Sequence, residues 1–253
     1  MIKKITLIGS GNVAHNLGKA FLLNGLEVSE VYSRTKTNAK VLAEKLEANY
    51  TNNLNELNQE SDLYIIATSD NAIEKIANEL KLGNKLVVHT SGSVGIEVLK
   101  NASKNYGSFY PLQTFTKTHQ ADFSEVPICI EGNNKESLKA LSQIAGKLTN
   151  TVNELSSAQR QKLHLAAVFV SNFANYMQVI GEELCEEQQV DFELLKPLIK
   201  EVFEKNQTAK AIDNQTGPAL RGDSFTMNKH LELLKDKKEL KKLYQLISEL
   251  IGL

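Results

Sequence analysis

The sequence predicts an α/β fold in which a doubly wound parallel sheet is followed by an all-α domain. Up to about residue 153, short segments rich in β-branched residues alternate with segments of helical periodicity, an order that is typical of a parallel sheet with right-handed crossovers. Beyond that point the strand-like alternation disappears and long helical stretches dominate. We therefore expect two domains, a sheet domain over residues 1–153 and a helical domain over residues 154–253.

The expected elements follow from the local pattern. Residues 5–8 form a short apolar run, as expected for a strand that is buried on both faces, and Asn24-Gly25 ends the helix that follows it. The expected strands are 5–8, 28–32, 63–67, 85–89 and 126–131. The expected helices are 13–23, 38–46, 72–80 and 135–147 in the sheet domain and 157–188, 192–206 and 226–253 in the helical domain.

The composition is that of an ordinary globular protein and argues against several classes of function. Of 253 residues, 42% are hydrophobic and 23% are charged, which is too apolar for a disordered chain. Lys and Arg number 29 against 30 Asp and Glu, and this balance argues against a nucleic-acid-binding protein and against a polybasic membrane anchor. Two cysteines, Cys129 and Cys185, are too few for a disulfide framework and lack the spacing of a zinc site. We expect a cytoplasmic protein with no metal centre.

No segment is expected to cross a membrane. The apolar residues near the N-terminus end at Gly9, too soon for a secretory signal. No run approaches the length of about 18 apolar residues that a bilayer requires. The longest apolar stretch, residues 163–170, contains His164 and is interpreted as a buried helix.

A glycine motif stands between the first expected strand and the first expected helix. It reads Gly9-Ser10-Gly11-Asn12-Val13-Ala14 and fits the dinucleotide-binding pattern G-x-G-x-x-A. In that pattern Gly9 permits the tight turn, Gly11 lets the backbone approach a pyrophosphate, and Ala14 keeps the helix close to the sheet. The N-terminus of the helix would supply N–H groups and a positive dipole end to the phosphates. The alternative is a glycine-rich turn without a ligand.

The end of the second expected strand indicates which dinucleotide is bound. An NAD site usually places Asp or Glu there, whereas this chain has Ser33, Arg34 and Thr35. Arg34 can pair with a 2′-phosphate and the two hydroxyls can support it, so the sequence favours NADP; otherwise Arg34 is an ordinary surface arginine. Ala67, Thr68 and Ser69 follow the next central strand and are expected to flank the ribose and nicotinamide.

Polar residues also follow the strand at 85–89. His89 ends the strand, and Ser91, Gly92 and Ser93 come directly after it, at the sheet edge where ligands of open α/β sheets bind. These four residues are predicted to bind substrate, although His89 is equally consistent with a core histidine. Gln113 lies in the aromatic segment 109–115, which forms either a pocket wall or part of the core.

Five parts of the sequence together match a known family. They are the Gly9 motif, 89–93, 109–115, 164–167 with 171–173, and 216–223. In these segments the chain resembles Rossmann-like proteins that carry a helical C-terminal domain of unknown function, number 2520, a group labelled NADP oxidoreductase, coenzyme F420-dependent-like. More distantly it is similar to pyrroline-5-carboxylate reductases, ketopantoate reductases and β-hydroxyacid dehydrogenases. The resemblance implies an NADP-dependent oxidoreductase with a helical domain that binds substrate and forms dimers.

The first helix of the helical domain carries the candidate catalytic residues. The related β-hydroxyacid dehydrogenases present a Lys and an Asn four residues apart on this helix, but here Lys162 is followed by Ala166. His164, Ser171 and Asn172 share one helical face with positions 168 and 175. A histidine titrates near neutral pH and suits proton donation during hydride transfer. We predict His164 as acid/base, with Ser171 and Asn172 orienting substrate; the alternative is a hydrogen-bond network between helices.

Two further features complete the hypothesis. Arg221, in a glycine-rich loop, could bind a substrate carboxylate, or it could pair with neighbouring Asp223. The apolar helix from Leu163 to Ile180 has more hydrophobic surface than a small helical domain needs, which indicates a homodimer. The sequence thus predicts an oxidoreductase that transfers a hydride between NADP and a small carbonyl or imine compound. The alternatives are a non-catalytic NADP-binding sensor and an enzyme with a deazaflavin as hydride partner.

Overall fold

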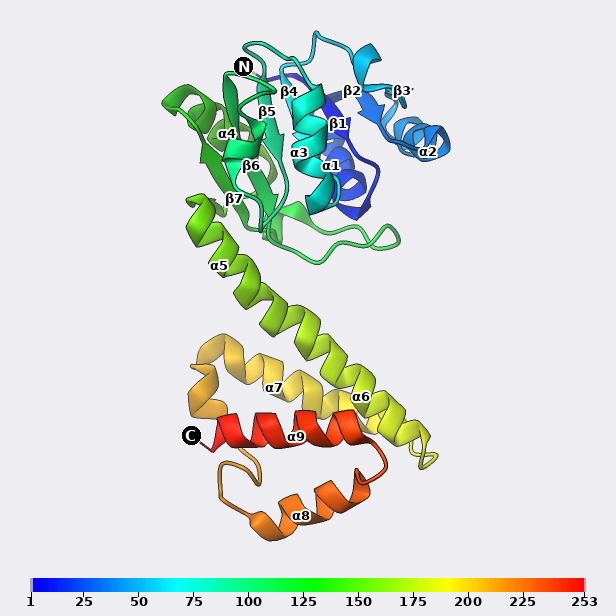
Figure 1. Ribbon diagram of the computed structural model, residues 1–253, viewed down its shortest axis with the longest axis vertical. Helices are drawn as coiled ribbons and strands as arrows, with labels where there is room; N and C mark the ends of the chain where they lie inside the picture. The colour runs from blue at the N-terminus through cyan, green and yellow to red at the C-terminus, as the bar shows by residue number, and fades with distance from the viewer. Residues whose placement is uncertain (1, 253) are drawn as a thin grey trace. The chain divides into compact units, whose positions relative to one another are not determined.

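The computed structural model describes residues 2–252 and confirms the predicted fold class (Figure 1). Its sheet has eight strands in the order β3-β2-β1-β4-β5-β6-β7-β8. All neighbouring strands are parallel except β6 and β7, which run antiparallel. The strand order changes direction between β1 and β4, and this switch point is where open α/β sheets bind ligands.

The elements of the sheet follow the predicted alternation closely. The strands are β1 (Lys4–Ile8), β2 (Glu27–Tyr32), β3 (Asn49–Thr51), β4 (Leu63–Ile66), β5 (Leu86–His89), β6 (Asn105–Pro111), β7 (Ile128–Gly132) and β8 (Val152–Glu154). The helices among them are α1 (Asn12–Leu23), α2 (Lys36–Leu46), α3 (Asp70–Glu79) and α4 (Lys135–Leu148), with short 3-10 turns that include η2 (Ile96–Leu99).

Helices cover both faces of the sheet, as the doubly wound arrangement requires. On one face α1, α2 and α4 bury alternate strand residues such as Ile5 and Leu7. On the other face lies α3 (Figure 1). Together with η2 it covers Ile66 and Val87. Both faces are therefore largely apolar, and the polar residues predicted to bind the cofactor follow the ends of the strands.

Three strands, β3, β6 and β8, were not among the predicted strands, and β6 is the longest of them. Its sequence is interrupted by Gly107 and ends at Pro111, so it lacks the continuous apolar run of the other central strands. Gly107 is required by the pairing, because a Cβ there would lie 2.0 Å from the carbonyl oxygen of Glu131 on β7. Phe109 on the same strand is fully buried, so this part of the aromatic segment belongs to the core.

The remaining helices divide between two compact units, 2–175 and 176–252. The last strand ends at Glu154 and the first helix after it begins at Ser157. The expected final helix is broken into two at residues 234–237. The helical elements are α5 (Ser157–Ala167), a π-helical segment (Val168–Phe173), α6 (Ala174–Glu186), α7 (Lys196–Thr208), α8 (Ser224–Leu233) and α9 (Lys238–Ile251), with 3-10 turns at Phe192–Leu195 and Ala211–Asn214.

The long apolar helix is not the buried helix that the sequence suggested. The stretch Ser157–Glu186 is long and apolar enough, by length and composition, to cross a membrane. It is also not buried in the single chain, since Leu165, Phe169 and Val170 are 59%, 60% and 71% exposed. The first turns of this stretch nevertheless pack against the sheet, where Arg160 is fully buried and pairs with Glu131 on β7. The exposed apolar side chains lie on a face that a single chain does not cover.

Candidate functional site

The turn after β1 has the geometry that a phosphate-binding turn requires. Gly9 has a φ of +132°, and a Cβ on it would lie 2.1 Å from the carbonyl oxygen of Ala67. Gly11 caps α1 without any side-chain hydrogen bond to the first N–H groups. A Cβ on Gly11 would meet nothing within 4 Å. The start of α1 thus presents backbone N–H donors and a positive dipole end to open space.

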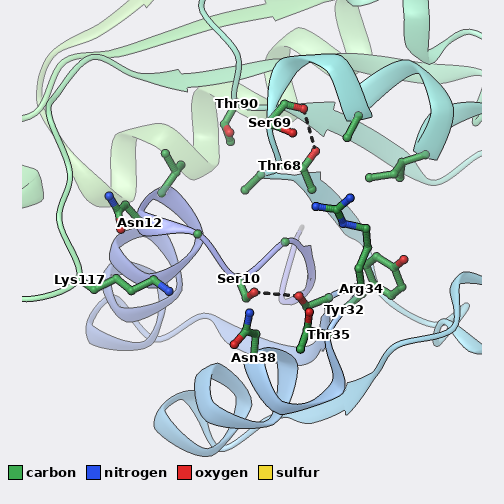
Figure 2. Close-up of a pocket in the computed structure, with 17 residues that line it drawn as sticks. Ser10, Asn12, Tyr32, Arg34, Thr35, Asn38, Thr68, Ser69, Thr90 and Lys117 are labelled. Atoms are coloured by element: carbon green, nitrogen blue, oxygen red, sulfur yellow. Dashed lines mark hydrogen bonds between the residues drawn. The ribbon is translucent and has the colours of Figure 1, made fainter. Parts of the chain in front are cut away.

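The cavity at this switch point has a volume of about 480 Å³ (Figure 2). Eleven of the twelve residues predicted to bind the cofactor line it: Gly9, Ser10, Gly11, Asn12, Val13, Ser33, Arg34, Thr35, Ala67, Thr68 and Ser69. The exception, Ala14, is fully buried and packs the helix on the sheet, which is the role its place in the motif predicts. Ser10 donates its hydroxyl to that of Ser33 at 2.9 Å, which joins the turn after β1 to the turn after β2.

The cavity carries two cations, on opposite sides in the view of Figure 2. Arg34 follows β2, as predicted. Lys117 comes from the loop between β6 and β7 and was missed. That loop is tied to α1 by Asn12, whose amide donates to the carbonyl of Phe115 at 2.8 Å, and by Asn16, whose amide donates to the carbonyl of Thr116 at 2.9 Å. Nothing in the sequence around Lys117 indicates this placement.

These residues fit NADP. The turn at Gly9 and the uncapped start of α1 suit a pyrophosphate, and Gly11 leaves the space a dinucleotide needs. Arg34, with the hydroxyls of Ser33 and Thr35, suits a 2′-phosphate because no carboxylate lines the described cavity.

A second cavity, of about 330 Å³, contains the predicted catalytic residues. His164, Ser171 and Asn172 line it from the helix, and Tyr110 and Gln113 line it from the end of β6 and the loop after it. Between His164 and Asn172 the helix widens into the π-helical segment Val168–Phe173. Such segments shift the register of the side chains and are frequent at functional sites.

His164 lies between two other residues of the unit 2–175, Tyr110 and Gly92. The hydroxyl of Tyr110 lies 3.0 Å from Nδ1 of His164, and the two rings meet edge to face at 5.9 Å between centroids. Gly92 packs against the imidazole so closely that a Cβ there would lie 2.6 Å from Cγ of His164. Burial raises the pKa of Tyr110 to about 12, so this hydroxyl keeps its proton at neutral pH.

The segment after β5 is built into the protein more deeply than its predicted substrate-binding role requires. His89 is fully buried, its Nδ1 accepts from the backbone N–H of Ser91, and burial followed by the nearby charge of Arg160 lowers its pKa to about 4. Ser91 is also buried, and its hydroxyl accepts from the backbone N–H of Ser93 at 3.1 Å. Ser93 is exposed and donates its hydroxyl to Asp70. None of these side chains lines the second cavity, so direct contact with substrate does not fit His89 or Ser91.

An ion pair that the sequence did not reveal fixes this segment. Arg160 on α5 is fully buried and pairs with Glu131 on β7. Its guanidinium also donates to the backbone carbonyls of Ser91, at 3.1 Å, and Val94, at 2.6 Å. Glu131 accepts in turn from the backbone N–H of Ser157 at 2.9 Å. A weak signal was present, because Ser156 begins a capping box one turn before Arg160 and so fixes where the helix starts.

Arg221 belongs to the unit 176–252. It is exposed and lies in the turn before α8. Within residues 2–252 it forms no ion pair, and the neighbouring Asp223 instead caps α8 by accepting from the backbone N–H of Thr226 at 3.0 Å.

Two family models match the sequence. Residues 4–92 match the family described as NADP oxidoreductase, coenzyme F420-dependent, and residues 126–251 match a domain of unknown function, DUF2520. No curated protein matches the sequence significantly. These are the two families that the sequence resembles, so the matches confirm the resemblance.

Solved structures match over nearly the whole chain. A Bacteroides fragilis protein assigned as an NADP oxidoreductase is 39% identical, with a TM-score of 0.93, and the alignment covers 99% of this chain and 98% of that one. An imine reductase from Myxococcus stipitatus in complex with NADP⁺ is 17% identical, with a TM-score of 0.67 and coverage of 98% and 92%. A pyrroline-5-carboxylate reductase from Coxiella burnetii is also 17% identical, with a TM-score of 0.61 and coverage of 100% and 97%. The last two share the fold.

Proposed function

The chain belongs to a family of NADP oxidoreductases, and from that premise we propose that it transfers a hydride between NADP and a small carbonyl or imine compound. One observation carries the proposal. Thr90 lines the dinucleotide cavity, and Gly92, two residues further on, touches His164 in the second cavity. This closeness supports the proposal, because His164 would then lie near the end of the sheet where a nicotinamide is expected.

In this proposal the residues of the second cavity handle the substrate. NADP, when bound, supplies or accepts the hydride. His164 exchanges the proton that the reaction requires, while Ser171, Asn172 and Gln113 orient the substrate. Gly92 and Ser93 act by positioning His164 and α3 respectively. Arg221 remains a candidate for binding a substrate carboxylate, since its guanidinium is exposed.

Replacing His164 with glutamine should lower kcat by about 10²- to 10⁴-fold, the usual contribution of a general acid. The affinity for NADPH should not change, because His164 does not line the dinucleotide cavity. The measurement is NADPH oxidation with a panel of keto acids, aldehydes, imines and a deazaflavin, alongside a fluorescence titration with NADPH. Full turnover by His164→Gln would contradict the catalytic role. Tight NADPH binding without turnover of any compound by the wild type would favour a non-catalytic sensor.

Replacing Arg34 with glutamine should weaken NADPH binding by about 10- to 100-fold, since a hydrogen bond to a charged group contributes about 1.5–3 kcal/mol. NADH, which lacks the 2′-phosphate, should bind as before. The matched control is Lys36→Gln, which removes a positive charge from α2 outside the cavity. Fluorescence titrations with both dinucleotides measure the change, and an equal loss for NADH would contradict the assignment.

We also infer that the protein is a cytoplasmic homodimer. Within residues 176–252, Leu234 is the only buried hydrophobic side chain, whereas Phe225, Leu198 and Leu250 are at least 60% exposed. A helical unit with so many exposed apolar side chains is expected to bury them against another surface. A second copy of the chain would supply that surface.

Sedimentation velocity should therefore give the mass of a dimer. Val170→Asp, which places a charge on the exposed apolar helix, should shift the protein toward monomer because burying an unpaired carboxylate is costly. Leu23→Asp, at an equally exposed apolar position on α1, is the control and should leave the dimer intact. A monomeric wild type would overturn the inference.

A further inference from the structure

The hydrogen bond between Tyr110 and His164 has a preferred direction. In a neutral histidine one ring nitrogen carries a proton and the other accepts. If Nδ1 of His164 donated, the hydroxyl proton of Tyr110 would need another acceptor. Within the described chain, Nδ1 of His164 is the only hydrogen-bond partner of this hydroxyl, and Tyr110 is 9% exposed. Leaving a buried hydroxyl proton unpaired costs about 1–3 kcal/mol, so Tyr110 donates and Nδ1 accepts.

That direction fixes the other nitrogen of the ring. With Nδ1 accepting, the proton of neutral His164 resides on Nε2. When His164 is charged, Nε2 carries a proton as well. The burial that raises the pKa of Tyr110 to about 12 keeps the hydroxyl protonated throughout the neutral range, so it donates to Nδ1 while the ring is neutral. When the ring is charged, Nδ1 carries a proton and the hydroxyl oxygen accepts from it. In both charge states, His164 therefore offers an N–H donor from Nε2.

The other walls of the second cavity are consistent with a neutral acceptor as the reacting group. Among the described residues that line it there is no aspartate or glutamate, so nothing there would neutralise a cation. A protonated imine carries a positive charge and presents its own N–H donor, which would face the N–H of His164. A carbonyl oxygen is neutral and accepts.

We propose that Tyr110 is a positioning residue that keeps Nε2 of His164 protonated and so makes the site selective for carbonyl compounds over protonated imines. This inference rests on the proposed function and narrows its substrate class. In the reduction a hydride joins the carbonyl carbon, the π pair moves to the oxygen, and the proton from Nε2 of charged His164 completes the alcohol. The ring is then neutral with its remaining proton on Nδ1, and exchange with solvent, in which Nε2 gains a proton and Nδ1 loses one, restores the form that accepts from Tyr110.

The tautomer can be measured without turnover. In the full-length protein labelled with ¹⁵N at the histidine rings, His164 is identified by the signals lost in His164→Gln. At pH 8 we expect Nε2 protonated and Nδ1 unprotonated in the wild type, and a mixture of both tautomers in Tyr110→Phe. The control is Tyr106→Phe on the same strand, whose hydroxyl bonds Glu97 at 3.0 Å, and it should match the wild type. A proton on Nδ1 of the wild type, or no change in Tyr110→Phe, would overturn the inference.

The substrate class is tested with a ketone and the imine of the same carbon skeleton. We expect kcat/KM with NADPH to favour the ketone at least 100-fold, and Tyr110→Phe to lower kcat for the ketone about tenfold with NADPH affinity unchanged. The Nε2 signal should also shift when the ketone is added with NADP⁺, and not when the imine is added. Preference for the imine in either measurement would overturn the selectivity. Unchanged turnover by His164→Gln would instead refute the proposed function, and the tautomer result would still stand.

Discussion

Replacing Glu131 with glutamine is expected to lower the free energy of unfolding by about 3–5 kcal/mol, the usual cost of removing one partner of a buried ion pair. The guanidinium of Arg160 is fully buried and would lose its only counter-charge within the described chain. Chemical denaturation followed by circular dichroism measures the loss. Glu44→Gln is the control, because its pair with Lys40 is exposed and such pairs contribute less than about 1 kcal/mol.

The same substitution should also impair the reaction. Arg160 holds the carbonyls of Ser91 and Val94, and Gly92 between them forms the surface against which His164 packs. Under conditions in which Glu131→Gln remains folded, kcat should fall while NADPH affinity stays unchanged. A variant as stable as the wild type would show that Arg160 finds other compensation, and this would contradict the structural role of the pair.

Replacing Gly9 with alanine should destabilise the protein and abolish NADPH binding, whereas replacing Gly11 with alanine should weaken NADPH binding alone. At Gly9 the φ of +132° costs an L-residue roughly 1–3 kcal/mol, and the added Cβ would also collide with the backbone of Ala67. We expect a lower melting temperature and no measurable NADPH binding. At Gly11 a Cβ meets no protein atom, so Gly11→Ala should keep the melting temperature. Its NADPH affinity should fall by at least about tenfold, or about 1.4 kcal/mol, because the methyl group occupies the space needed by the pyrophosphate.

Thermal unfolding and fluorescence titration separate the two outcomes. A Gly11→Ala variant that binds NADPH like the wild type would show that the dinucleotide does not approach this backbone. A stable Gly9→Ala variant would show that the turn can relax away from Ala67.

The dinucleotide site was predictable because its information is local. The motif from Gly9 to Ala14 and the residues after β2 are each contiguous in sequence, and parallel strands bring their ends to one edge of a sheet. The contacts around the second cavity were harder to predict from the sequence. Arg160 and Glu131 are 29 residues apart, and Tyr110 and His164 are 54 apart. Only the fold brings these pairs together.

Three differences between prediction and structure also have physical causes. Strand β6 was missed because Gly107, which its pairing with β7 requires, breaks the apolar pattern that identifies a strand. His89 was assigned to substrate because polar residues at strand ends usually face a ligand, whereas here the imidazole turns inward and accepts from the N–H of Ser91. Lys117 was missed because it lies in a loop without a motif, which contacts from Asn12 and Asn16 hold beside the cavity.

The loop between β6 and β7 forms part of the wall of both cavities. Gln113 lines the second cavity, Lys117 lines the dinucleotide cavity, and Asn12 of the glycine motif bonds the carbonyl of Phe115 between them. The two ligands would therefore contact one loop, which the bonds from Asn12 and Asn16 hold to α1. By linkage, whatever factor one ligand exerts on the affinity for the other through this loop, the second exerts on the first.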